Sequence, residues 1–165
     1  MEPVKIGLLG LGTVGGGTVT VLTRNAAEIA RRAGREIHIA RAAAIQYNPD
    51  IPGLDQIGEI GNDGFALVDD PEIDIVIELI GGYSPARELV LRAIANGKHV
   101  VTANKALIAR HGNEIFAAAR EQGVVVAFEA AVAGGVPIIK ALREGLAANR
   151  IEWIAGIING TGNFI

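Results

Sequence analysis

The sequence contains no cysteine, and aromatic residues make up only 4% of it. The absence of cysteine excludes a disulfide framework, a cysteine-ligated metal site and a thiol nucleophile within the 165 residues. The shortage of aromatic residues means that the core is aliphatic, because half of all residues are hydrophobic. An aliphatic core is typical of a parallel β-sheet that helices cover on both faces.

Charge of one sign and long apolar runs are also scarce. The formal net charge of −3 provides no basic surface for nucleic acid or for an anionic membrane. No uninterrupted apolar run is long enough to cross a bilayer, and no basic segment precedes an apolar stretch at the N-terminus. We therefore expect a cytoplasmic protein whose partner is a small molecule rather than nucleic acid or a membrane.

Glycine, in contrast, is abundant, with 22 residues. The apolar run over residues 4–9 predicts a buried strand, and Gly10-Leu11-Gly12-Thr13-Val14-Gly15 follows it at once. This hexapeptide fits G-x-G-x-x-G, which in the order strand, glycine turn, helix predicts a dinucleotide site. The helical pattern that follows places these residues on one face: Val14, Thr18, Val21, Leu22 and Ile29.

Each glycine of the motif has a separate physical role. Gly10 allows the tight turn out of the strand, and Gly12 lets a pyrophosphate approach the backbone. Gly15 lets the helix pack close to the strand, and the helix N-terminus offers free N–H groups to the phosphates. Gly16 and Gly17 prolong the run, and each glycine inside a helix costs about 1 kcal/mol relative to alanine. Packing against the sheet must therefore hold this helix.

Six strand candidates alternate with helical patterns along the chain. The sequence therefore predicts one α/β domain, a Rossmann-type doubly wound parallel sheet with strand order 3-2-1-4-5-6. Residues 48–64 are rich in Pro, Gly, Asn and Asp and are expected to form a loop. The expected strands cover residues 4–9, 36–45, 74–80, 98–102, 124–128 and 151–158.

The end of the second expected strand bears on the choice between NAD and NADP. A carboxylate there favours NAD, and a nearby arginine accommodates the 2′-phosphate of NADP. Here the strand ends in Ile45 and Gln46, and Asp50 lies further on in a loop. Arg41 lies inside the strand and is either a phosphate contact or a surface charge. Both cofactors therefore stay open.

Two charged residues follow strands at the predicted ligand-binding edge. Lys105 could bind a carboxylate, polarise a carbonyl or transfer a proton, or it could be a solvated lysine at a helix start. Glu129 could be a base, a metal ligand or a member of an ordinary ion pair. The turn over residues 130–135 has no polar side chain, so a cation bound there would need backbone carbonyl ligands.

The three histidines are scattered along the chain. His38 and His99 lie in or beside expected strands, and His111 lies on a helix surface. We interpret all three as structural.

Five stretches together resemble homoserine dehydrogenase: residues 7–15, 74–83, 97–107, 128–139 and 156–165. The resemblance implies an oxidoreductase that interconverts L-aspartate 4-semialdehyde and L-homoserine with NAD or NADP, in the biosynthesis of threonine, methionine and isoleucine. It also implies an NAD(P)-binding domain over residues 1–150, the start of a substrate-binding and dimerisation region at 151–165, and a homodimer in the complete enzyme.

The resemblance further assigns roles to single residues. Lys105 matches a catalytic lysine, whereas the family's second catalytic lysine and its substrate-binding acids would lie beyond Ile165. The positions that match cofactor-binding residues are Gly10, Leu11, Gly12, Thr13, Val14, Gly15, Ile80, Gly81, Gly82, Thr102 and Lys105. A monovalent cation, usually sodium, would bind main-chain oxygens of Glu129, Val132, Gly134 and Val136.

Two features depart from the family pattern. Many relatives carry a basic residue at the position of Ile45, and most have bulkier residues after Gly15.

One rival interpretation is a sensor module that binds NAD(P) and catalyses no reaction. Another is a different dehydrogenase that acts on an aldehyde, such as aspartate-semialdehyde dehydrogenase; that reaction needs a cysteine nucleophile, and these 165 residues contain none. On the leading interpretation, residues 1–165 alone bind cofactor but do not turn over substrate.

Overall fold

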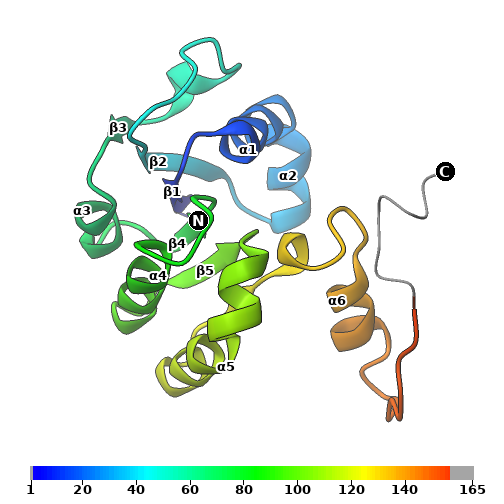
Figure 1. Cartoon of the computed structure of the whole chain (residues 1–165). Helices are drawn as coiled ribbons and strands as arrows, with labels where there is room; N and C mark the ends of the chain where they lie inside the picture. The colour runs from blue at the N-terminus through cyan, green and yellow to red at the C-terminus, as the bar shows by residue number, and fades with distance from the viewer. Residues whose placement is uncertain (1, 157–165) are drawn as a thin grey trace, which may run out of the picture.

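The structure, a computed structural model, describes residues 2–156, and its centre is one parallel sheet with the strand order β3-β2-β1-β4-β5-β6 (Figure 1). All neighbouring strands pair in parallel, so the prediction of a doubly wound α/β sheet is confirmed. The strands are β1 (Val4–Leu9), β2 (Ile37–Ala43), β3 (Glu59–Gly61), β4 (Ile75–Glu78), β5 (His99–Thr102) and β6 (Val126–Ala127).

Helices cover both faces of this sheet, α1 and α2 on one side and α3, α4 and α5 on the other (Figure 1). From β1 the strand order runs through β2 to β3 in one direction, whereas β4, β5 and β6 extend the sheet in the opposite direction. The boundary between β1 and β4 is therefore the switch point of the fold. The helices are α1 (Thr13–Arg24), α2 (Ala26–Ala33), α3 (Gly64–Asp69), α4 (Ala86–Ala95), α5 (Lys105–Gln122) and α6 (Ile138–Lys140), with short helical turns at η1 (Leu54–Gln56), η2 (Glu129–Ala131) and η3 (Ala141–Gly145).

The structure corrects the predicted strands at two places. Residues 59–61, predicted as part of a loop, form the outer strand β3 beside β2. The strand at 75–78 therefore pairs directly with β1 and is fourth in the chain. Residues 151–156 form no strand, and residues 157–158 lie outside the described part of the chain. A three-residue strand such as β3 is too short to leave a periodic signal in the sequence.

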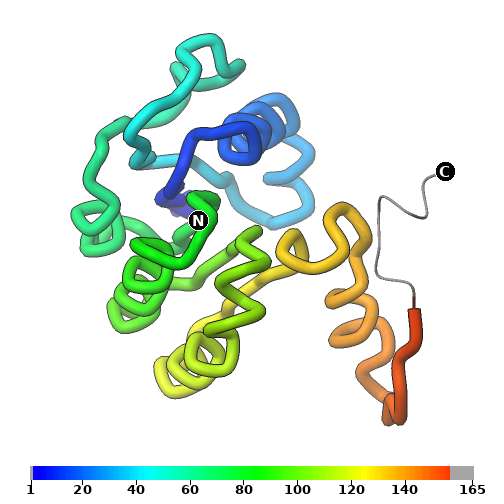
Figure 2. The backbone as a smooth tube through the Cα atoms, viewed as in Figure 1, coloured from blue at the N-terminus to red at the C-terminus, as the bar shows by residue number. Residues whose placement is uncertain are grey.

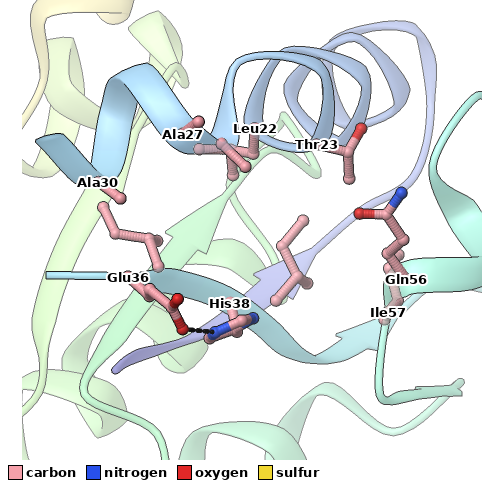
Figure 3. Close-up of a pocket in the computed structure, with 11 residues that line it drawn as sticks. Leu22, Thr23, Ala27, Ala30, Glu36, His38, Gln56 and Ile57 are labelled. Carbon is pink, nitrogen blue, oxygen red and sulfur yellow. Dashed lines mark hydrogen bonds and ion pairs between the residues drawn. The ribbon is translucent and has the colours of Figure 1, made fainter. Parts of the chain in front are cut away.

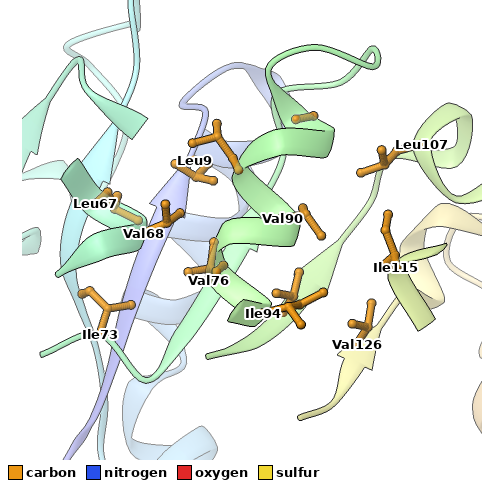
Figure 4. Close-up of a cluster of buried hydrophobic side chains, with 14 of the residues drawn as sticks. Leu9, Leu67, Val68, Ile73, Val76, Val90, Ile94, Leu107, Ile115 and Val126 are labelled. Atoms are coloured by element: carbon orange, nitrogen blue, oxygen red, sulfur yellow. The ribbon is translucent and has the colours of Figure 1, made fainter. Parts of the chain in front are cut away.

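The core lies in two layers, one on each face of the sheet. Leu8 and Leu9 of β1 point to opposite faces and are both 0% exposed, which marks β1 as a central strand. Leu9 belongs to the larger layer, which α3, α4 and α5 cover (Figure 4). Leu8 packs in the other layer, with Leu11 and with Val19 of α1. Burying each such side chain contributes about 1.5–3 kcal/mol.

The buried face of α1 differs from the one predicted. Val14 and Val21 are 56% and 45% exposed, and the buried residues of the helix are Gly15, Gly16 and Val19. A Cβ on Gly16 would lie 3.0 Å from Cδ1 of Ile51, and a Cβ on Gly15 would lie closer still to backbone. The glycines face the fold because α1 approaches more closely than an apolar side chain permits.

Beyond η2 the chain runs away from the sheet (Figure 2). Val136, Trp153 and Ile154 in this part are more than half exposed, at 58%, 78% and 68%. Within residues 2–156, no helix is both long and apolar enough to cross a membrane.

Candidate functional site

The glycine turn after β1 has the geometry that a dinucleotide needs. Gly10 adopts φ +96°, in the left-handed region that favours glycine. A Cβ on Gly10 would lie 2.9 Å from the carbonyl oxygen of Leu79, so the turn packs directly on the loop after β4. The carboxyl ends of β1 and β4 thus meet at the switch point, where ligands bind in folds of this kind.

The N-terminus of α1 is left open for a ligand. Gly12 caps the helix without any side-chain hydrogen bond, and a Cβ at Gly12 would meet nothing within 4 Å. The first backbone hydrogen bond into the helix runs from the N–H of Gly16 to the carbonyl of Gly12, at 2.8 Å. The preceding N–H groups can therefore donate to an anionic ligand such as a pyrophosphate.

Two cavities flank this turn. One of about 310 Å³ lies between the ends of β1, β2 and β4 and is lined in part by Gly10, Gln46 and Ile80. The other, of about 590 Å³, lies between α1 and the loop that follows β2, and its lining includes Gly12 and Asn48. Among residues 2–156, no lysine or arginine lines either cavity. In the part of the chain that the structure describes, the one charged side chain that lines either cavity is therefore that of Asp50.

Arg41 is not directed at these cavities. Its guanidinium bonds to Glu59 at 2.8 Å and to Asp70 at 3.0 Å. Hydrogen bonds to Glu59 and then to Asp70 raise the pKa of the guanidinium. Ile45, just after β2, is 91% exposed, and its apolar side chain offers no charge to a phosphate. The structure therefore favours the interpretation of Arg41 as a structural surface charge.

Sequence reasoning missed a buried carboxylate at the end of β4. Glu78 is 0% exposed, and its Oε1 accepts the N–H groups of Ile80 at 2.9 Å and Gly81 at 3.2 Å. Its Oε2 accepts the hydroxyl of Thr102 at 2.7 Å. A glutamate inside the otherwise apolar run of this strand was the available signal. Glu78 holds two backbone amides of the predicted cofactor loop.

Asn104 was also missed, and it places Lys105. Its Oδ1 accepts the N–H of Leu107 at 3.0 Å, which caps α5, and its Nδ2 donates to the carbonyl of Gly82 at 2.7 Å. Lys105 is the first residue of α5 and is exposed. In the described part of the chain, no hydrogen bond or ion pair engages its side chain. The structure thus places Lys105 at the same edge as the loop over residues 80–82, with its ammonium group available.

Glu129 has a structural partner. Its carboxylate accepts the N–H groups of Ile139 and Lys140, both at 2.8 Å, and so caps the N-terminus of α6. The carbonyl oxygens of Glu129 and Val136 each accept one backbone N–H, from Val132 at 3.1 Å and from Ile138 at 2.8 Å. Over residues 2–156, no group of three or more His, Asp or Glu side chains is arranged to hold a metal. The main-chain cation site stays a prediction.

A third cavity, of about 340 Å³, lies beneath α2 and against β2, where none of the predicted site residues lines it (Figure 3). His38 stands at its rim, with Nε2 3.1 Å from the Glu36 carboxylate. His99 accepts the N–H of Val125 at its Nδ1, at 3.0 Å. His111 lies 3.7 Å from Glu114 on α5. These contacts agree with structural roles for the histidines.

Taken together, a parallel doubly wound sheet, a glycine turn at its switch point and an open helix N-terminus define a dinucleotide-binding α/β domain of the Rossmann type. The comparisons make this more specific. The family model described as "Homoserine dehydrogenase, NAD binding domain" matches residues 10–129, and the model "Homoserine dehydrogenase" matches residues 137–165. The chain belongs to the homoserine dehydrogenase family.

Comparison with individual curated proteins supports the same family assignment. A homoserine dehydrogenase of Pseudomonas aeruginosa is 69% identical over all of this chain, which covers 38% of the relative. That of Neisseria gonorrhoeae is 59% identical, with the same 38% covered. This chain thus spans about two fifths of the length of these curated relatives.

Solved structures give the same result. A crystal structure of homoserine dehydrogenase from Thiobacillus denitrificans superimposes with a TM-score of 0.90 at 68% identity, over 99% of this chain and 38% of that one. A hyperthermophilic archaeal homoserine dehydrogenase in complex with NADPH superimposes at 0.69 and 26% identity, over 89% of this chain and 50% of that one.

Proposed function

We propose that this chain is the cofactor-binding part of a homoserine dehydrogenase, which interconverts L-aspartate 4-semialdehyde and L-homoserine in the biosynthesis of threonine, methionine and isoleucine. The observation that carries the proposal is the meeting of an open glycine turn and an unpaired lysine, Lys105, at one sheet edge. Residues 1–150 would bind NAD(P), and residues 151–165 would begin the substrate-binding and dimerisation region of a homodimer.

The chain's own residues have definable tasks in this reaction. The open N–H groups from Gly12 onward would hold the pyrophosphate, and the empty space over Gly12 gives it access to the backbone. When bound, the nicotinamide supplies or accepts the hydride. Lys105 would donate a proton to the alkoxide that forms from the aldehyde oxygen, or withdraw one in reverse. Its charge would stabilise that oxygen in the transition state.

Among residues 2–156, the Asp50 carboxylate is the one charged side chain that lines these two cavities, and this bears on the choice of cofactor. A lysine or arginine that would pair with the 2′-phosphate of NADP is absent from the lining, and so is a carboxylate at the end of β2 that would bind the 2′-hydroxyl of NAD. We propose that the site accepts both cofactors with little charge-based discrimination.

The direct test is a parallel titration of residues 1–165 with NADH and NADPH, followed by nicotinamide fluorescence. We expect both to bind, with affinities within about one order of magnitude of each other. Homoserine-dependent reduction of NAD(P)+ is then measured on the full-length protein. Cofactor binding without any such reduction would favour a sensor module. Failure to bind either cofactor would contradict the proposal for residues 1–165.

A monovalent cation, sodium, is proposed for the turn after β6, on main-chain oxygens of Glu129, Val132, Gly134 and Val136. The support is chemical, since the turn offers carbonyl oxygens and no competing cationic side chain. Replacing sodium chloride by choline chloride at constant ionic strength should lower the melting temperature of the full-length protein. An unchanged melting temperature would argue against the site.

A further inference from the structure

A buried carboxylate joins the ends of β4 and β5. Glu78 and Thr102 are register partners in these two strands, and both are 0% exposed. The Glu78 carboxylate accepts three hydrogen bonds, two from the N–H groups of Ile80 and Gly81 and one from the Thr102 hydroxyl. Burying a carboxylate is costly unless such bonds compensate it. A buried carboxylate is therefore unfavourable at a position that serves packing alone, because an apolar residue would pack there without this cost.

The bonds have a defined direction. The hydroxyl of Thr102 donates its hydrogen to Glu78, which leaves its oxygen free to accept the N–H of Asn104 at 3.0 Å. Glu78 acts only as an acceptor, as a carboxylate does. The chain of donors therefore runs from Asn104 through Thr102 to Glu78, and no buried side-chain polar atom among residues 2–156 lacks a partner.

Asn104 closes a loop of contacts. Its Nδ2 donates to the carbonyl of Gly82 at 2.7 Å, so residues 80–82 are held by Glu78 on one side and by Asn104 on the other. Gly81 and Gly82 have φ values of +82° and +69°, a region that glycine adopts readily but at a large loss of backbone entropy, so the bonds to Glu78 and Asn104 restrict an otherwise free segment. The next residue after Asn104 is Lys105.

We propose that Glu78, Thr102 and Asn104 are positioning residues that fix the loop over residues 80–82 against the start of α5, and so set the placement of Lys105 relative to the bound cofactor. The inference rests on the proposed function, because it concerns the same site. None of the three is assigned to the reacting atoms. They act through the loop amides and through Lys105.

The first variants separate the tie to Gly82 from the helix cap. Asn104→Ser keeps a capping hydroxyl for α5 but cannot reach Gly82. Asn96→Ser is the matched control, because Asn96 also donates its Nδ2 to a backbone carbonyl, that of Val68 at 3.0 Å, at the end of α4. In the full-length protein, Asn104→Ser should lower kcat at saturating cofactor by about 10- to 100-fold. Asn96→Ser should leave kcat unchanged.

The second pair tests the hydroxyl. Thr102→Val removes the hydroxyl that bonds to Glu78 and to the N–H of Asn104, at nearly constant side-chain shape, and should lower kcat about as much as Asn104→Ser does. Thr102→Ser keeps a hydroxyl and should retain most of the wild-type kcat. Equal kcat for these two variants, or wild-type kcat for Asn104→Ser in a folded protein, would overturn the proposal. A merely structural role would move the melting temperature and leave kcat in place.

A readout that is independent of turnover keeps the two proposals separate. In wild-type residues 1–165, amide hydrogen exchange at Ile80 and Gly81 should be slow, because Glu78 accepts both N–H groups. Glu78→Met removes both acceptor oxygens at a similar side-chain length, so exchange should accelerate and the affinity for NADH should fall. Unchanged exchange and affinity in this variant would refute the positioning role, whether or not the full-length protein oxidises homoserine.

Discussion

Gly15 lies so close to Gly10 that a methyl group on Gly15 would stand 2.0 Å from the Gly10 carbonyl oxygen. The obstacle is the backbone of the glycine turn, which cannot give way without distorting the turn. Gly17, in contrast, has nothing within 4 Å of its own Cβ position. Two glycines of one helix therefore differ in what they tolerate.

This difference predicts opposite effects on stability. Gly15→Ala should destabilise the domain by about 1–3 kcal/mol, because the added methyl overpacks against backbone. Gly17→Ala should stabilise it by up to about 1 kcal/mol, because alanine is the better helix former. Urea denaturation of both variants measures the difference. Equal free energies of unfolding would contradict the close approach of α1.

Gly12→Ala tests the cofactor cradle separately from the fold. The position has open space, so the free energy of unfolding should change by less than about 1 kcal/mol. The methyl group would occupy the space through which a pyrophosphate reaches the helix N-terminus. The affinity for NADH, measured by fluorescence, should fall at least about 10-fold. Gly17→Ala, which should bind as the wild type does, is the control.

Lys105→Ala should leave the fold intact and remove activity. The side chain is exposed and unpaired in the described structure, and a positive charge at a helix N-terminus is mildly unfavourable, so stability should stay equal or rise slightly. In the full-length protein, kcat should fall by about 10²- to 10⁴-fold. Arg24→Ala removes an exposed cation from another helix and serves as the control. Near-normal turnover would make Lys105 a solvated lysine.

Arg41→Gln should alter stability and not cofactor choice. The variant breaks the contacts with Glu59 and Asp70 and should cost about 1 kcal/mol in urea denaturation. The ratio of NADH to NADPH affinity should stay at its wild-type value, because Arg41 lines neither cavity at the glycine turn. A selective loss of NADPH binding would instead make Arg41 a phosphate contact.

Low pH should lower the stability of the protein through Asp70, the partner of Arg41. The N–H of Glu72 and the guanidinium of Arg41 lower the pKa of the Asp70 carboxyl in the folded protein. A lowered folded-state pKa stabilises the protein above the carboxyl's ordinary pKa of about 3.9, and this contribution disappears as the pH falls through the folded-state value. The free energy of unfolding should therefore drop as the pH falls below about 5 and on through the lowered folded-state pKa, and Asp70→Asn should flatten that dependence.

The sequence was informative where a single element has a distinctive local pattern. The strand and glycine turn at β1 and the alternation of strands with helices predicted the sheet and its ligand-binding edge, because apolar runs and glycine motifs are local signals. The strand β3 was not predicted because its three residues become a strand only by pairing with β2, which is a tertiary contact. The buried face of α1 was misassigned because hydrophobic periodicity cannot reveal a helix that packs through glycine.

The candidate site shows the same division. Lys105 and the glycine turn were found because each stands at a strand end. Glu78 and Asn104 were not, because their importance lies in bonds across β4 and β5 that no spacing within one element encodes. The cation ligands and the roles of single cofactor-binding residues stay predictions.

Gly16 differs from Gly15 in what it meets, since its missing side chain makes room for Ile51, a residue 35 positions later in the loop after β2. That loop is further tied to α1 by the Thr20 hydroxyl, which donates to the carbonyl of Pro52 at 3.3 Å. A larger residue at position 16 would thus require a smaller one at position 51. Among homologues these two positions should covary, whereas position 15 should remain glycine and position 17 should drift independently.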